Sequence, residues 1–222
     1  MNTPITERQL QWCYKDIQPA VQALAKRLGE SPTEVPKWKV LGTGGHATVY
    51  WLSDRTKVLK VTKDVTDAHA SAIVQRKPDP SLIKVYDVFQ LYGCKTLYFI
   101  VAEKLTPLSG KAEDLVSRLR DFPYDIGIPL DPIIEELEEF EHARKHPANK
   151  LEEKIPAYLK LHDITEKDIQ QLWKWARALD RRDIVWNDFK KENIMMRGHD
   201  LVISDLGYNV APSVQIPVVA VT

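Results

Sequence analysis

The segment Trp186-Asn187-Asp188-Phe189-Lys190-Lys191-Glu192-Asn193, with Ile203-Ser204-Asp205-Leu206-Gly207 a short hairpin later, decides the fold. The spacing of Asp188 and Asn193 places a carboxylate and an amide oxygen at opposite ends of a tight loop. Asp205 adds a further hard oxygen at a strand end. Mg²⁺ binds to one or two carboxylates together with phosphate oxygens. These residues, in this order, therefore predict a site for magnesium and phosphate.

A glycine-rich turn lies upstream, in Leu41-Gly42-Thr43-Gly44-Gly45-His46-Ala47-Thr48-Val49-Tyr50. Glycines let backbone amides approach a phosphate closely. A strand pattern follows the turn, whereas a dinucleotide-binding fold needs a helix there, and no P-loop lysine is present. A glycine turn between strands is by itself more often structural.

Lys60 is a cation inside the apolar strand 58–61. Such a lysine is commonly an edge or snorkelling residue. Its position one hairpin after the glycine turn is nevertheless where a phosphate-binding lysine is needed.

The order of elements predicts an α+β fold with two lobes. Residues 7–28 show helical spacing that we expect Pro19 to interrupt, and 31–36 has the composition of a linker. Five strand-like segments follow between 38 and 105, with one helix at 66–76. The chain then becomes helical, and strand character returns at 184–185 and 201–203.

These motifs together resemble those of protein kinases, over about residues 38–210. The glycine turn matches the glycine-rich loop, Lys60 the third-strand lysine, Asp188 to Asn193 the catalytic loop, and Asp205-Leu206-Gly207 the metal-binding D-F-G. Lys190 is typical of serine/threonine protein kinases, and the shortened C-terminal part resembles the short protein kinases of tailed bacteriophages. The resemblance implies an N-terminal helical extension (1–37), a β-rich N-lobe (38–105) and a reduced helical C-lobe (106–222).

The resemblance also implies a role for each matching residue. Asp188 would orient the acceptor hydroxyl and accept its proton, and Lys190 would steady the γ-phosphate. Asn193 and Asp205 would hold Mg²⁺. Ala102 would be the gatekeeper beside the adenine. The implied ATP contacts are Gly42, Gly44, Gly45, Ala47, Val49, Val58, Lys60, Glu103, Leu105 and Met195.

The sequence departs from the kinase pattern in several places. No glutamate lies between Lys60 and Ala102 to pair with the lysine, and the expected position falls near Ala70. Asp67 and Gln75 lie about one turn away on either side, and Asp67 is the substitute we expect. Trp186-Asn187 replaces the His-Arg before the catalytic aspartate, and the stretch after Asp205 is too short for a usual activation segment.

Composition limits the classes of partner. The 222 residues carry 31 basic and 31 acidic side chains, so no net charge attracts nucleic acid or an anionic membrane. Cys13 and Cys94 are far apart and fit no metal-finger pattern, and we expect them to be reduced. No segment has the character of a signal peptide or a membrane span. These features predict a soluble cytoplasmic protein.

The activity expected from the sequence is Mg²⁺·ATP-dependent phosphorylation of serine or threonine in proteins, with the chain itself among the acceptors. The sequence leaves two alternatives open. One is a small-molecule kinase of the aminoglycoside-phosphotransferase type, against which Lys190 argues. The other is an ATP-binding pseudokinase that acts as a binding module, which the missing glutamate favours and the intact Asp188, Asn193 and Asp205 disfavour.

Overall fold

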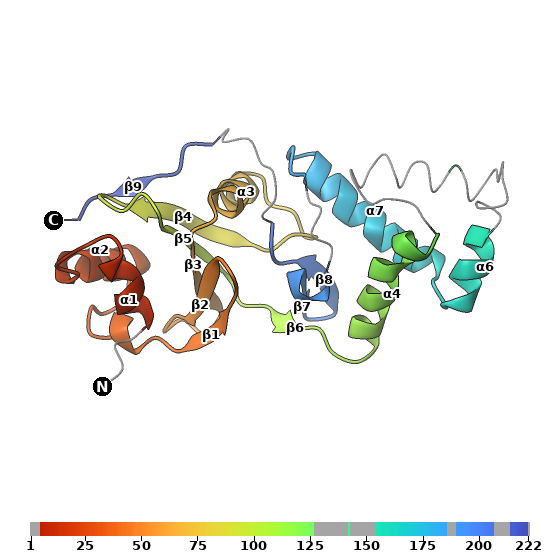
Figure 1. Cartoon of the computed structure of the whole chain (residues 1–222), viewed down its shortest axis with the longest axis horizontal. Coiled ribbons are helices and arrows are strands. Elements are labelled where there is room, and N and C mark those ends of the chain that lie inside the picture. The colour runs from red at the N-terminus through yellow and green to blue at the C-terminus, as the bar shows by residue number, and fades with distance from the viewer. Residues whose placement is uncertain (1–4, 127–141, 143–153, 186–189, 207–213, 222) are drawn as a thin grey trace. The chain divides into compact units, whose positions relative to one another are not determined.

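The computed structural model of the chain describes residues 5–126, 142, 154–185, 190–206 and 214–221. Its helices and strands form an α+β fold, as the sequence predicts (Figure 1). The chain divides into two compact units. Unit 1 comprises Met1–Pro78, Lys84–Lys104 and Ala211–Thr222, and unit 2 comprises Asp79–Ile83 and Leu105–Val210. Within the described ranges, no helix is long and apolar enough to cross a membrane.

Unit 1 is built on a six-stranded sheet in the order β1-β2-β3-β5-β4-β9. The first five strands pair antiparallel, and all of them lie within residues 38–105, where the sequence predicts five strand-like segments. The helix between β3 and β4 was also expected, and it is α3 (Val65–Arg76). The strands are β1 (Val40–Thr43), β2 (Ala47–Trp51), β3 (Lys57–Thr62), β4 (Val85–Leu91), β5 (Tyr98–Glu103) and β9 (Val218–Val219).

Residues 5–37 contain three short helical segments that pack on one face of this sheet. They are α1 (Ile5–Gln11), α2 (Gln18–Leu28) and the 3-10 helix η1 (Val35–Lys37). Their apolar side chains join one buried cluster with Tyr50, Leu59 and other residues of the sheet. Helix α3 lies on the opposite side of the sheet (Figure 1). The sheet of unit 1 is therefore covered on both faces.

The position of Pro19 differs from the sequence expectation. Pro19 does not end a helix but lies in the first turn of α2, where its missing N–H costs nothing. The break between the two helices falls before it. Gly29 ends α2 with a φ of 69°, a left-handed conformation that glycine adopts without strain.

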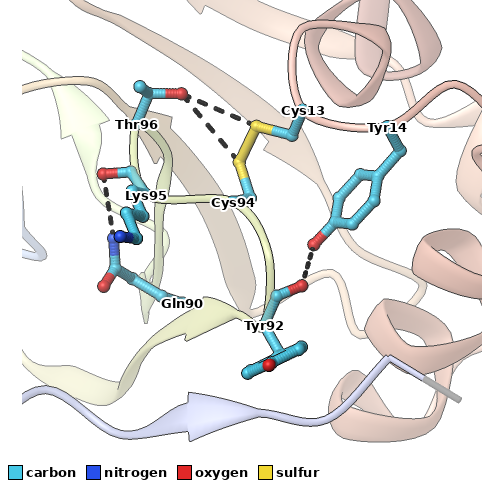
Figure 2. The surroundings of a disulfide bond; sticks show 7 residues. All are labelled: Cys13, Tyr14, Gln90, Tyr92, Cys94, Lys95 and Thr96. Carbon is cyan, nitrogen blue, oxygen red and sulfur yellow. Dashed lines mark hydrogen bonds between the residues drawn. A yellow bond between two sulfur atoms is a disulfide. The ribbon is translucent and has the colours of Figure 1, made fainter.

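The two cysteines are paired, so the expectation of two separate, reduced thiols is wrong. Cys13 and Cys94 form a disulfide with Cα atoms 5.0 Å apart and a sequence separation of 81 (Figure 2). The sheet brings the turn between β4 and β5 beside the end of α1, which sequence spacing alone does not reveal. This bond ties the N-terminal helices covalently to the sheet.

Unit 2 contains a three-stranded sheet in the order β6-β7-β8 and the described helices of the second half of the chain. A capping box is present at Thr165, with Asp168 accepting from the Thr165 N–H at 2.8 Å. Residues 184–185 were expected to form a strand but are irregular. The elements are β6 (Thr106–Pro107), α4 (Lys111–Ile126), α6 (Lys154–Leu161), α7 (Glu166–Asp180), η2 (Lys191–Asn193), β7 (Ile194–Arg197) and β8 (Asp200–Ile203).

The chain rejoins unit 1 soon after Asp205. The backbone oxygen of Gln215 accepts a bond from the Arg76 side chain at 3.2 Å, and that of Pro217 accepts from the Gln90 N–H at 2.9 Å. Strand β9 then extends the sheet beside β4, in parallel. This return, which the sequence did not predict, covers the edge of β4.

Candidate active site

Four residues expected to contact ATP share one face of the unit 1 sheet. Val49 is paired with Lys60, and Val58 is paired with Ala102. Directly paired residues project from the same face, and so do alternate residues of one strand. These four side chains therefore belong to the face that carries α3, and Tyr50 and the apolar cluster belong to the other.

Lys60 forms an ion pair with Asp67 of α3. Its Nζ lies 2.9 Å from Asp67 Oδ2, and the exposed fractions of the two side chains are 17% and 5%. The substitute carboxylate expected from the sequence is thus the residue that meets the lysine. Gln75, the other candidate, instead donates to the Tyr86 backbone oxygen at 2.9 Å.

The start of α3 is fixed by Asp64, its N-cap residue. The Asp64 carboxylate accepts from the backbone N–H groups of Thr66 at 2.8 Å and Asp67 at 3.3 Å. Burial raises the pKa of Asp64, but these hydrogen bonds and that of the Thr66 hydroxyl outweigh it, so its pKa lies below the usual value. The cap holds the turn that bears Asp67.

The glycine-rich turn connects β1 to β2, where the Gly44 N–H donates to the Ala47 oxygen at 2.8 Å. None of Gly42, Gly44 and Gly45 has a left-handed φ. A Cβ built on Gly42 or Gly45 would meet no heavy atom within 4 Å. Neither backbone conformation nor internal packing therefore requires a glycine at 42 or 45, and both positions are exposed, so a ligand can approach the backbone closely there.

The hinge residues expected to contact adenine lie where β5 ends. The Glu103 N–H donates to the Lys84 oxygen at 2.9 Å. Of the two backbone groups of Glu103, the carbonyl oxygen is therefore the one that we expect to contact adenine. Leu105 is buried and belongs to unit 2.

In unit 2, the expected metal ligands Asn193 and Asp205 flank the β7–β8 hairpin. Ile194 is paired with Ile203, so Asn193 and Ser204 lie at the same end of the hairpin. The Ser204 N–H donates to the Asn193 backbone oxygen at 2.8 Å, and Asn193 is 5% exposed. The pairing therefore holds Asn193 beside the residue that precedes Asp205.

Two arginines that sequence reasoning missed bind the segment 79–83, which belongs to the same unit as the hairpin. Arg197 donates to the backbone oxygens of Pro80 and Leu82 at 2.7 and 2.9 Å. Arg182, just ahead of the catalytic loop, forms a buried ion pair with Asp79 at 3.3 Å. An isolated arginine carries no signal in a sequence that would reveal such a partner.

The remaining expected residues are in unit 2 or outside the described residues. Lys190 is exposed at the start of η2, and the adjacent Lys191 pairs with Glu113 of α4 at 3.0 Å. Met195 lies in β7, paired with Pro107. Asp188, with the rest of 186–189, lies outside the described residues, as does Gly207.

The side chains present fit a magnesium ion shared with a nucleotide. The described part of the chain has no cluster of three or more His, Cys, Asp and Glu that would form an all-protein metal cage. Mg²⁺ needs no such cage, because it retains water and takes oxygen ligands from phosphates. The Asp205 carboxylate and the Asn193 amide oxygen are hard ligands of the required kind.

No protein-family model matches the sequence, and no curated protein matches it. Among solved structures, similar chains are aminoglycoside phosphotransferases. APH(4)-Ia is 11% identical with a TM-score of 0.39, and the alignment covers 86% of this chain and 71% of that one. The streptomycin–ATP ternary complex of APH(2")-IIa is 12% identical with a TM-score of 0.32, over 87% and 71% of the two chains. Similarity this low carries no argument about the reaction or substrate of this chain.

Proposed function

We propose that the chain is an ATP- and Mg²⁺-dependent phosphotransferase with a kinase-like site. The observation that carries this proposal is the buried Lys60–Asp67 ion pair on the same sheet face as Val49, Val58 and Ala102. A lysine held by a carboxylate in this way can pair with the α- and β-phosphates of ATP. The open glycine-rich turn supports the same use.

In the proposed reaction, the acceptor hydroxyl oxygen bonds to the γ-phosphorus as the bond from this phosphorus to the ADP oxygen breaks. Asp188 accepts the hydroxyl proton, and Lys190 stabilises charge on the transferred group. Asn193 and Asp205 are the residues that would hold Mg²⁺, which neutralises phosphate charge when bound. The backbone at Gly42 to Ala47 covers the phosphates.

Lys190 favours a serine or threonine hydroxyl of a protein as the acceptor, because a lysine two residues after the catalytic aspartate is typical of protein kinases. A small hydroxylated molecule is the second candidate, and the return of the chain to unit 1 at Gln215 favours it. The segment between Asp205 and this return is shorter than the activation segment of protein kinases.

Transfer of labelled phosphate from Mg²⁺·ATP tests the proposal and separates the two acceptors. The purified chain is offered its own surface, a bacterial lysate and, in a parallel reaction, a panel of aminoglycosides. Acid-stable label on serine or threonine supports a protein acceptor, and a labelled aminoglycoside supports a small-molecule acceptor. Label on neither, or label that persists in both Asp188→Ala and Asp205→Ala, contradicts the proposal.

A further inference from the structure

Helix α1, on the face of the sheet opposite α3, contacts β2, the strand that follows the glycine-rich turn. Gln9 Nε2 donates to Thr48 Oγ1 at 3.2 Å, and Tyr50 donates its hydroxyl proton to Gln9 Oε1 at 2.7 Å. All three residues are buried, and both partners lie in β2. Gln9 therefore fixes β2 from the face opposite Lys60.

A second contact joins the same helix end to the glycine-rich turn. The Lys63 ammonium lies 3.5 Å from the centre of the Trp12 ring, a cation–π contact. The backbone N–H of Lys63 donates to the His46 oxygen, within the turn itself, at 2.9 Å. The end of α1 is thus linked through Lys63 to His46 in the turn and through Gln9 to β2, which follows the turn.

Covalent attachment holds α1 in this place. The disulfide from Cys13 reaches Cys94 in the turn between β4 and β5, and the next residue, Tyr14, donates to the Tyr92 oxygen at 2.6 Å (Figure 2). Gly93, with a φ of 86°, passes beside the Tyr14 ring. A seven-residue helix is too short to be stable alone, so α1 depends on these attachments.

We propose that Gln9 is a positioning residue for the glycine-rich hairpin (β1, the turn and β2) and that the Cys13–Cys94 disulfide locks it in place, so that nucleotide affinity depends on the oxidation state. On oxidation, the two thiols lose two protons and two electrons to a small disulfide such as oxidised glutathione, which becomes two thiols as the Cys13–Cys94 bond forms. A dithiol reverses the step. The nucleotide part of this inference rests on the proposed function, and the hairpin part does not.

Amide hydrogen exchange of the full chain tests the hairpin part without any nucleotide. The wild-type protein is compared after oxidised glutathione and after dithiothreitol, and peptide mapping without reductant verifies the Cys13–Cys94 link. We expect exchange in residues 42–50 to be about two- to tenfold faster after reduction, the factor that corresponds to one or two hydrogen bonds. Two free thiols in the oxidised sample, or equal exchange in both samples, would overturn the inference.

Side-chain variants separate positioning from general structural support. Gln9→Ala is compared with Gln11→Ala, which alters an exposed glutamine of the same helix. We expect Gln9→Ala to raise the KM for ATP about two- to tenfold with a smaller change in kcat, and Gln11→Ala to change neither. Tyr50→Phe removes one of the same hydrogen bonds without disturbing α1. In a double-mutant cycle its effect should not add to that of Gln9→Ala.

The outcomes distinguish this inference from the proposed function. Faster exchange after reduction in a chain that binds no nucleotide would support the locked hairpin and contradict the phosphotransferase. Nucleotide binding and phosphate transfer that are indifferent to reduction and to Gln9→Ala would support the phosphotransferase and overturn the lock. Equal effects of Gln9→Ala and Gln11→Ala would also overturn the positioning role.

Discussion

The Lys60–Asp67 ion pair has nearly the same N···O distance as a second pair, Lys57–Asp54, but its side chains are less exposed. The N···O distances are 2.9 and 2.8 Å, but Lys57 and Asp54 are 36% and 44% exposed. An exposed pair contributes little, whereas the loss of a partner from a buried pair leaves an uncompensated charge. The unit 1 sheet thus offers a matched control for its own candidate catalytic lysine.

Replacing Asp67 with asparagine should therefore lower kcat/KM for ATP-dependent transfer about ten- to a hundredfold, because a charge-assisted bond to Lys60 is worth about 1.5–3 kcal/mol. Asp54→Asn should leave it within about twofold. Steady-state kinetics on both variants tests this. Equal effects of the two substitutions on kcat/KM would show that the Lys60–Asp67 ion pair does not contribute to the reaction.

Ala102 gives a second prediction at a single side chain. It is buried and paired with Val58 on the proposed nucleotide face, where the gatekeeper role would put its small methyl group beside the adenine. A bulky aromatic adenine analogue should inhibit the wild type at least about tenfold more strongly than Ala102→Met. The KM for ATP itself serves as the control and should change little. Equal inhibition of both proteins would contradict the assignment.

The sequence predicted Lys60 and named Asp67 as its partner, but it did not predict the position of the partner by counting. Counting along the chain placed the missing glutamate near Ala70, and the aspartate that fills the role lies one turn earlier. A shorter side chain from a position nearer the start of α3 reaches the same lysine. The rotation of α3 about its own axis decides whether Asp67 or Gln75 reaches Lys60. The spacing of residues in the sequence does not determine this rotation.

Helix α3 carries the carboxylate, so its N-cap links secondary structure to the site. Asp64→Ala should lower the free energy of unfolding by about 0.5–2 kcal/mol at neutral pH and raise the KM for ATP. Asp16→Ala is the matched control, because Asp16 accepts a backbone N–H at the start of α2 at 3.0 Å, on a helix without Asp67. Asp16→Ala should leave the KM unchanged; an equal rise in both variants would contradict this role for α3.

The same cap predicts a pH dependence. The pKa of Asp64 is lowered in the folded chain, so its charge adds stability above the unfolded pKa of about 4. This contribution is lost as the pH falls through the folded pKa. Denaturant unfolding at pH 7 and pH 3 should show a smaller drop for Asp64→Asn than for the wild type. A drop of the same size in both would show that the carboxylate does not contribute.

Strands and helices with a local signal were predictable, and those that depend on a distant partner were not. The alternating β-branched and aromatic residues of β2, β3 and β5 specify strands by themselves. Strand β9 has two residues and exists because β4 offers an edge to pair with. Residues 184–185 have strand-like side chains, yet they find no partner among the described strands.

For the chain as a whole, the disulfide is a covalent feature whose contribution to stability can be measured directly. It closes a loop across 81 residues, and cross-links over loops of this length add about 2–4 kcal/mol. Reduction should therefore lower the free energy of unfolding of the wild type by about that amount. Guanidinium unfolding with and without dithiothreitol measures it. The double variant Cys13→Ser/Cys94→Ser should not respond to the reductant, and a wild type that also fails to respond would contradict the bond.

Composition and motif spacing predicted the class of fold and the candidate chemistry. They did not predict that the N-terminal helices pack on the unit 1 sheet or that β9 pairs with β4. The N-terminal sequence does not indicate that it covers the sheet. Its apolar spacing predicts that α2 buries one face, but not which element that face packs against. The link from Cys13 to Cys94 and the return at Gln215 are likewise products of three-dimensional proximity.

The most direct test of the proposed site is calorimetric titration of the chain with Mg²⁺·ATP, using Lys60→Met and the exposed Lys57→Met as a matched pair. We predict binding by the wild type with a Kd between about 1 μM and 1 mM, the usual range for enzyme substrates. Lys57→Met should bind equally well, and Lys60→Met about tenfold or more weakly. Absence of binding by the folded wild type, or equal affinities of all three proteins, would contradict a nucleotide site built on Lys60 and Asp67.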